Sequence, residues 1–172
     1  MTTFHLAGGC FWCLDAVYRT LRGVTDVTSG YTGGTVAHPS YELVCAGSTG
    51  HAETARVTFD ETQIPAETVL DVFFTMHDPT QLNRQDGDIG TQYRSAMFYT
   101  DDGQRALFEA ARDRAAGWWG STVTAIEPLT TFYEAEGYHQ DFYAKNPGQG
   151  YCMVVTRPKV LKIRKRFAQY AR

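Results

Sequence analysis

Apolar and polar positions alternate along the chain in a way that predicts both strands and helices. Short apolar or alternating runs predict strands at residues 3–7, 24–29, 52–59 and 95–99. Helical spacing of apolar residues predicts one helix between Gly9 and Gly23 and a second that starts at Pro65. The resulting order, β-α-β-β-α-β, is the split βαβ arrangement of ferredoxin-like folds.

Further elements extend this predicted core. We expect a helix at 102–116, a strand at 123–126 and a last helix from Pro158. The apolar residues of that last helix that we expect to face inward are Val160, Leu161, Ile163 and Phe167. The aromatic residues within 128–151 fit no single period. The prediction is an α+β protein with one domain over residues 1–172, extra helices, long loops at its site and a C-terminal helix.

Charge and composition exclude several partners. The formal net charge is −3 with both signs interspersed, so no field is expected that would attract nucleic acid or anionic lipid. The basic residues between Lys159 and Arg166 are expected to form a solvated helix face. No segment has the roughly 20 apolar residues that span a bilayer, and no signal peptide is visible. We therefore expect a cytoplasmic monomer whose four cysteines are reduced at rest.

The stretch GGCFWC, residues 8–13, carries the first candidate chemistry. Cys10 follows a Gly-Gly turn and opens a helix, where unpaired N–H groups and the helix dipole would favour its thiolate. Cys10 and Cys13 could serve a zinc site, a dithiol–disulfide exchanger, or a thiol that passes through sulfenic acid. Zinc is disfavoured because Cys45 and Cys152 are isolated and the histidines lack ligand spacing.

Two large rings lie between these cysteines. Phe11 and Trp12 could line a small apolar pocket beside the thiol, which would suit a methyl or thioether group. The alternative, that both rings point into the core, is equally compatible with the spacing.

Polar partners for such a thiol occur in two long, glycine-broken loops. The first, residues 30–53, ends at Glu53. Apolar surroundings would raise the pKa of this carboxylic acid, so that it could act as a general acid near neutral pH. The second, residues 83–95, contains Asp88 and Tyr93. Together with Tyr41, these side chains could supply hydrogen bonds around a polarised oxygen.

Five blocks of sequence resemble the peptide methionine sulfoxide reductase A family. They are Gly9-Cys10-Phe11-Trp12, residues 30–34 (GYTGG), residues 41–53 (YELVC and TGHAE), residues 88–95 (DIGTQYRS) and Tyr138-His139-Gln140. The blocks occur in register from about residue 3 to 167, which makes the resemblance specific.

The resemblance implies a ferredoxin-like core and reduction of the S epimer of methionine sulfoxide, free or in proteins. It implies that Cys10 attacks the sulfoxide sulfur, that Glu53 gives a proton to the oxygen, and that Phe11 and Trp12 hold the methyl group. The remaining implied site residues are Tyr41 and Tyr93 as donors to the oxygen, and Asp88 as organiser of the polar side. No metal or organic cofactor is expected, and thioredoxin or a similar dithiol protein would supply the electrons.

The chain departs from the family pattern at Cys13, a position where the family often has glycine, and at Asp15, which we expect to stabilise the first helical turn. Many family members resolve the sulfenic acid through a C-terminal cysteine, and Cys152 lies where such a residue could be. The segment after it, however, is typical of an apolar strand and a helix. We expect Cys13 to resolve first, Cys152 to act as a relay or a core thiol, and Cys45 to be structural.

Two alternatives remain open. A general thiol–disulfide oxidoreductase would use Cys10 and Cys13 and would reduce insulin disulfides. A peptide-binding module with inert cysteines would tolerate Cys10→Ser. Neither alternative needs Glu53 or the tyrosines.

Overall fold

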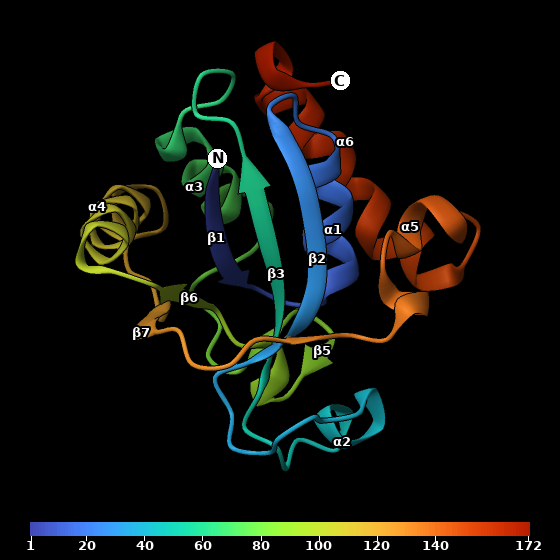
Figure 1. The fold of residues 1–172 in the computed structure, drawn as a ribbon. Coiled ribbons are helices and arrows are strands. Elements are labelled where there is room, and N and C mark those ends of the chain that lie inside the picture. The colour runs from blue at the N-terminus through green and yellow to red at the C-terminus, as the bar shows by residue number, and fades with distance from the viewer.

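A six-stranded sheet runs through the centre of the protein, whose residues 1–172 are all described by a computed structural model (Figure 1). Its strands are β1 (Thr2–Ala7), β2 (Val24–Thr32), β3 (Ala52–Phe59), β6 (Ala96–Tyr99), β7 (Ala125–Pro128) and β8 (Tyr133–Glu134). They lie in the order β7-β6-β1-β3-β2-β8, and every neighbouring pair is antiparallel except β6 with β7. A separate ribbon pairs β4 (Arg84–Gln85) with β5 (Asp88–Ile89). The protein therefore has a mixed α/β architecture around one central sheet.

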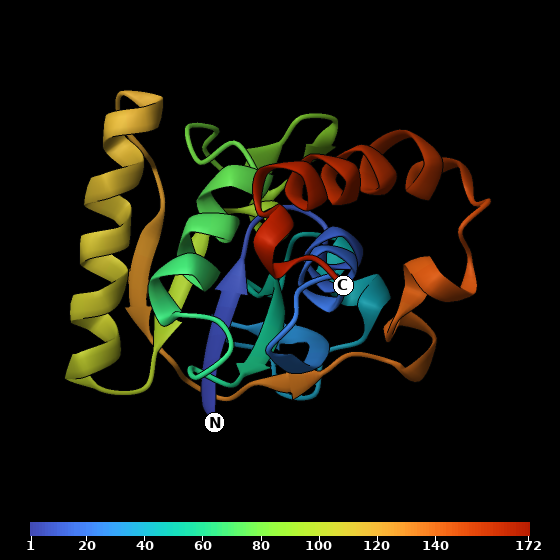
Figure 2. The same cartoon turned by 90° about the horizontal axis from the view of Figure 1, so that it is seen from above.

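Helices cover one face of this sheet (Figures 1 and 2). The helices α1 (Phe11–Arg19) and α3 (Ala66–Met76) lie along it, and α6 (Arg157–Arg166) contacts both of them. The long helix α4 (Asp102–Trp119) packs beside α3 and β6. Two short helices, α2 (Tyr41–Cys45) and α5 (Phe142–Lys145), lie within the loops.

The core follows from the predicted alternation. In β3, Ala55, Val57 and Phe59 share one face of the strand and are fully buried. Apolar residues of α1 and α3 meet this face in one cluster of 31 buried residues. The buried hydroxyl of Tyr18 donates to the carbonyl oxygen of Val69 at 2.8 Å, so its polar atom is satisfied where α1 meets α3.

The structure corrects several sequence-based predictions. The first four predicted strands and two predicted helices occur within a few residues of their expected bounds. The segment after Cys152 forms no strand, because residues Cys152–Thr156 make a π-helical turn that continues directly into α6. Leu161 does not face inward and is 53% exposed. The segment 128–151 resolves into β8, a 3₁₀ turn at Gly137–His139 and α5.

Asp15 also differs from its predicted role. It lies beyond the first turn of α1 and is almost completely buried. Its carboxylate pairs with Arg19 and accepts the backbone N–H of Asp141 at 2.7 Å. Asp15 therefore connects α1 to the segment that precedes α5.

The basic residues near the C-terminus are solvated, as predicted, except that Lys159 is half-buried. None of the helices combines the length and apolar character that crossing a bilayer requires.

Candidate active site

The structure places Cys10 between the end of β1 and the start of α1. Gly9 turns the chain there with φ 84°, and a Cβ atom at this position would lie 3.0 Å from Gln85. Cys10 itself is extended, with φ −69° and ψ 132°, and its backbone carbonyl accepts the N–H of Cys13 at 3.1 Å. Its side chain is 8% exposed. Cys10 is thus the N-cap of α1, as the sequence predicted.

The predicted resting thiolate at Cys10 is wrong. Burial raises the pKa of the Cys10 thiol well above its usual range, and the nearby Glu53 carboxylate raises it further. A hydrogen bond from the backbone N–H of Trp12 acts in the opposite direction but does not reverse the shift. Desolvation outweighs the helix N-terminus, so the resting side chain is a neutral thiol.

Glu53 faces this turn from β3. Its side chain is 1% exposed, and its Oε1 accepts the backbone N–H of Phe11 at 3.1 Å. Burial raises the pKa of Glu53 to about 8, although the bond from Phe11 lowers it, and the negative charge of Asp88 adds to the rise. The site therefore holds a neutral carboxylic acid beside a neutral thiol at pH 7.

The two rings of the GGCFWC stretch have different surroundings. Phe11 is fully buried and packs against Tyr31, with ring centroids 5.6 Å apart. Trp12 is half-buried and stacks on Phe142, with centroids 3.7 Å apart and an interplanar angle of 3°. Trp12 therefore borders the accessible side of the site, whereas Phe11 points into the core, which is one of the two arrangements that the spacing left open.

Both predicted tyrosines lie near the thiol and the acid. Tyr41 begins α2 and Tyr93 ends the 3₁₀ turn Thr91–Tyr93, and both are half-buried. Burial is the main cause that raises the pKa of each phenol, and the nearby charges of Glu53 and Cys10 raise it further. Both hydroxyls therefore stay protonated and can donate hydrogen bonds. The carbonyl of Tyr93 also accepts the backbone N–H of Gly9 at 3.2 Å, which ties this turn to the Cys10 turn.

Asp88, on β5, meets a residue that the sequence analysis did not single out. The hydroxyl of Tyr151 donates to Asp88 Oδ2 at 2.5 Å and lies 3.9 Å from Cys13 Sγ. The ring of Tyr151 meets Trp12 edge to face, with centroids 5.8 Å apart. Tyr151 thus joins the polar side of the site to its aromatic side. In the sequence, only the position of Tyr151 directly before Cys152 could have indicated a role for it.

The remaining cysteines divide into two groups. Cys13 Sγ lies 3.3 Å from Thr156 Oγ1, and the thiol of Cys152 is hydrogen-bonded to the same Thr156 side chain. Both thiols are fully buried, and burial raises the pKa of each. Cys45 is exposed at the end of α2 rather than packed in the core, and it is hydrogen-bonded to Tyr41.

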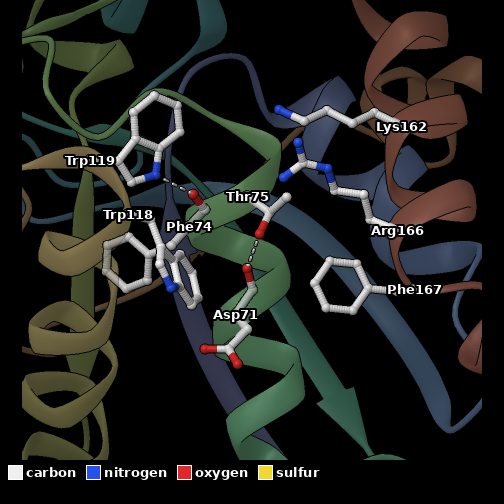
Figure 3. Close-up of a pocket in the computed structure, with 8 residues that line it drawn as sticks. All are labelled: Asp71, Phe74, Thr75, Trp118, Trp119, Lys162, Arg166 and Phe167. Atoms are coloured by element: carbon white, nitrogen blue, oxygen red, sulfur yellow. Dashed lines mark hydrogen bonds between the residues drawn. The ribbon is translucent and has the colours of Figure 1, made fainter.

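A separate cavity lies away from this site, among α3, α4 and α6 (Figure 3). Its volume is about 550 Å³, and none of the predicted site residues lines it. The lining residues are Asp71, Phe74, Thr75, Trp118, Trp119, Lys162, Arg166 and Phe167. No three His, Cys, Asp or Glu side chains come together as a metal site.

Comparison with known proteins agrees with this chemistry. The family profile described as "Peptide methionine sulfoxide reductase" matches residues 2–171. A relative from Clavibacter michiganensis subsp. michiganensis, named "Peptide methionine sulfoxide reductase MsrA", is 67% identical and covers 100% of this chain and 99% of its own length. The reduced form of Mxr1 from Saccharomyces cerevisiae superposes with a TM-score of 0.83 at 36% identity, over 88% of each chain.

A structure of Mxr1 in complex with Trx2 shares the fold, with a TM-score of 0.59 at 24% identity over 82% of this chain and 84% of its own. The family profile covers residues 2–171, and the Clavibacter relative is 67% identical over 100% of this chain. This chain therefore belongs to the peptide methionine sulfoxide reductase family.

Proposed function

We propose that this chain reduces the S epimer of methionine sulfoxide, free or in proteins, to methionine and so repairs oxidised proteins. The observation that carries the proposal is the pairing of Cys10 with Glu53 at the N-terminus of α1. The buried carboxylic acid, with a pKa of about 8, still holds its proton at pH 7. A sulfoxide oxygen leaves sulfur only when it is protonated, so a nucleophile and an acid must act on the same S–O bond.

The reaction balances with these two groups. The sulfur of Cys10 attacks the sulfoxide sulfur while Glu53 gives its proton to the oxygen. The oxygen ends on Cys10 as sulfenic acid, methionine leaves as the thioether, and the thiol proton of Cys10 returns to Glu53. Because the pKa of Cys10 is raised, its proton is lost only as Glu53 gives its own proton to the oxygen and becomes a base, which couples attack to protonation.

The surrounding side chains would bind the substrate. Trp12 offers an apolar wall for the methyl group, and we assign Phe11 to the inner end of that pocket. Tyr41 and Tyr93 would donate hydrogen bonds to the oxygen as charge develops on it. Asp88, held by Tyr151 at 2.5 Å, would order the polar side.

A turnover assay with separated epimers tests this function. The expected result is methionine from the S epimer with a dithiol reductant, none from the R epimer, and none with Cys10→Ser. Cys45→Ser is the matched control and should retain activity, since Cys45 is exposed and outside the proposed thiol sequence. Insulin reduction without epimer preference would instead indicate a general thiol–disulfide oxidoreductase.

We propose that Cys13 resolves the sulfenic acid and that Cys152 then relays the disulfide. Cys13 Sγ lies 3.3 Å from Thr156 Oγ1, and the same Thr156 side chain is hydrogen-bonded to the Cys152 thiol, so Thr156 joins these two cysteines. Cys10 is the N-cap of α1 and Cys13 is its third residue, two positions whose side chain and backbone meet at a helix start, so a bond between the two sulfurs needs only a local shift. Condensation releases water, and exchange with Cys152 then frees Cys10 as a thiol.

The π-helical turn at Cys152–Thr156 favours this relay, because such turns are local irregularities that commonly occur at functional sites. Mass spectrometry of enzyme trapped after one turnover should show a Cys10–Cys13 disulfide first. In Cys152→Ser this bond should accumulate, and in Cys13→Ser the sulfenic acid should persist long enough for dimedone to trap it. A first-formed Cys10–Cys152 disulfide would reverse the proposed order.

The proposed reductant is thioredoxin, whose dithiol would supply two electrons and two protons to the final disulfide. The yeast relative Mxr1 forms a complex with Trx2, which supports this choice. We also propose that no metal or organic cofactor takes part. Metal analysis of the active protein, and its activity after chelation, test that part of the proposal.

We further propose a monomer that acts in the cytoplasm, and a single ferredoxin-like domain over residues 1–172. The order β6-β1-β3-β2 and the antiparallel pairing of these four strands support the fold assignment. Sedimentation and cell fractionation test the oligomeric state and the location.

A further inference from the structure

We propose that the cavity among α3, α4 and α6 is a binding site for a small ligand with a flat aromatic body and one anionic group. Its volume of about 550 Å³ lies within the usual range of small-molecule sites, and four of its eight lining residues are aromatic (Figure 3). No lining residue belongs to the site around Cys10, so the proposal does not depend on the proposed function.

Aromatic rings from three parts of the chain form the walls of this cavity. Phe74 on α3 is fully buried, and Phe167, directly after α6, is half-buried. Trp119, the last residue of α4, donates its indole N–H to the carbonyl oxygen of Phe74 at 2.9 Å, which holds this ring in place. Ring faces fixed in this way can bind a flat aromatic group by stacked or edge-to-face contacts.

Trp118 is the wall that the fold itself uses least. Its side chain is 54% exposed, although it borders the same cavity as the buried Phe74. Contact between a large apolar ring and water is unfavourable in proportion to the exposed area. An aromatic ligand would cover this ring, so binding would gain apolar burial that folding leaves unused.

Two cations on α6 define where the anionic group of the ligand would lie. Lys162 and Arg166 are one helical turn apart, and both extend from α6 toward α3 (Figure 3). Neither forms a salt bridge with a carboxylate of the chain. Burial lowers the pKa of Lys162, and the positive charges of Arg166 and Lys159 lower it further. An anion between the two side chains would relieve this repulsion and accept charge-assisted hydrogen bonds from both.

The acidic residue of the lining does not already supply this anion. Arg114 donates to Asp71 Oδ1 from Nη2 at 2.8 Å and from Nε at 3.2 Å, so the charge of Asp71 is paired. The carboxylate of Asp71 also points away from Lys162 and Arg166 (Figure 3). The α6 side of the cavity therefore keeps an excess of positive charge.

The two halves of the lining together determine the class of ligand. An inorganic anion would pair with the cations but leave the aromatic walls in contact with water. A neutral aromatic molecule would cover the walls but leave both cations without a partner. A compact molecule of two or three fused rings that carries a carboxylate or a phosphate satisfies both halves and is small enough for the cavity.

Calorimetric titration at about 0.15 M salt, where long-range attraction is screened, tests the ligand class. The two full probes are 2-naphthoate and 2-naphthyl phosphate, which separate a carboxylate from a phosphate ligand. The two partial probes are 2-naphthalenemethanol, which has the rings without the charge, and inorganic phosphate, which has the charge without the rings. We expect at least one full probe to bind saturably and both partial probes to bind at least about tenfold more weakly.

Variants of α6 and α4 test the place of binding. Lys162→Gln and Arg166→Gln should each raise the Kd of the full probe about tenfold, because each removes one charged donor. Lys165→Gln is the matched control, since it removes the same charge from the same helix but lies outside the lining, and its Kd should stay within twofold. Trp118→Leu should also raise the Kd about tenfold. If that variant does not fold, the α6 variants, which alter exposed side chains, decide the question.

Several results would overturn the proposal. Equal binding of 2-naphthalenemethanol would remove the anionic group from the ligand, and equal binding of inorganic phosphate would remove the aromatic body. An equal rise in Kd for Lys165→Gln and Lys162→Gln would indicate attraction by the overall charge of α6 instead of a site. No saturable binding of either full probe below about 10 mM would refute the site altogether. Sulfoxide reduction is not measured here, so a failure of the proposed function would be a separate result.

Discussion

The protonation states of two side chains, Cys10 and Glu53, determine which reactions this site can catalyse. The sequence predicted the raised pKa of Glu53, because a carboxylic acid near apolar residues loses hydration. It gave the wrong state for Cys10, because the local signal of a helix N-terminus was visible whereas the burial was not. The residues that bury Cys10 are distant from it in sequence, and burial is the largest cause of its raised pKa.

Replacement of Glu53 by glutamine should remove the acid while keeping a side chain of similar shape. We expect kcat/KM at pH 7 to fall by about 10²–10⁴, the usual contribution of a general acid. Above a pH of about 8, where Glu53 ionises, wild-type kcat/KM should fall as the pH rises, and the variant should lack this limb. A pH–rate profile measures both effects.

Glu109→Gln is the matched control, since Glu109 lies on the exposed surface of α4 and pairs with Arg105. Its profile should coincide with that of the wild type. A Glu53→Gln profile that keeps the alkaline limb would show that another group titrates there.

At the scale of elements, the turns and short loops carry most of what the sequence analysis missed. The strands and long helices were predictable, because apolar periods of two and about 3.6 are local signals. The segment that includes Glu136, His139 and Gln140 has no period, since side-chain hydrogen bonds to β2 and α1 hold it in place. The block Tyr138-His139-Gln140 matched the family pattern, but the sequence did not show which residues it contacts.

The turn between β1 and α1 provides a test at this scale. Gly9→Ala should destabilise the protein by about 1–2 kcal/mol, because a side chain in the left-handed region is strained. It should also lower activity, since the added Cβ would meet Gln85 and displace the Cys10 turn. Urea denaturation and a turnover assay measure the two effects.

Gly117→Ala is the matched control, because Gly117 lies within α4 and no atom is within 4 Å of an added Cβ. We expect it to stabilise the protein by about 1 kcal/mol and to leave activity unchanged. A Gly9→Ala variant with wild-type activity would contradict the proposed dependence of the site on this turn.

At the scale of the whole molecule, strand order explains how distant residues form one site. Because β3 lies between β1 and β2, Glu53 on β3 reaches the turn that follows β1. The ribbon β4-β5 and the segment before α6 then bring Asp88 and Tyr151 to the same place. The order of the elements was predictable, whereas Tyr151 was not identified, because its contact depends on how a C-terminal turn packs.

The buried acid also affects the stability of the whole fold. Glu53 has a pKa of about 8 when folded and about 4.3 when unfolded, so between these values the folded state holds the extra proton. Its contribution is therefore complete below the unfolded pKa and is lost as the pH rises through about 8. The resulting decline is at most about 1.4 kcal/mol per pH unit.

Urea denaturation of the reduced protein at pH 5 to 9 measures this decline. The unfolding free energy of Glu53→Gln, relative to that of the wild type, should increase steadily across the range up to pH 8. A difference that stays constant with pH would mean that Glu53 titrates alike in the folded and unfolded states.

The central claim is that the carboxyl group beside Cys10 is neutral when the substrate arrives. Titration of the Glu53 carboxyl carbon by ¹³C NMR, with Glu53→Gln used to assign the signal, tests this claim most directly. The account predicts a midpoint near pH 8, as the raised pKa requires. A midpoint near the ordinary glutamate pKa of about 4.3 would mean an ionised carboxylate at neutral pH and would contradict the account.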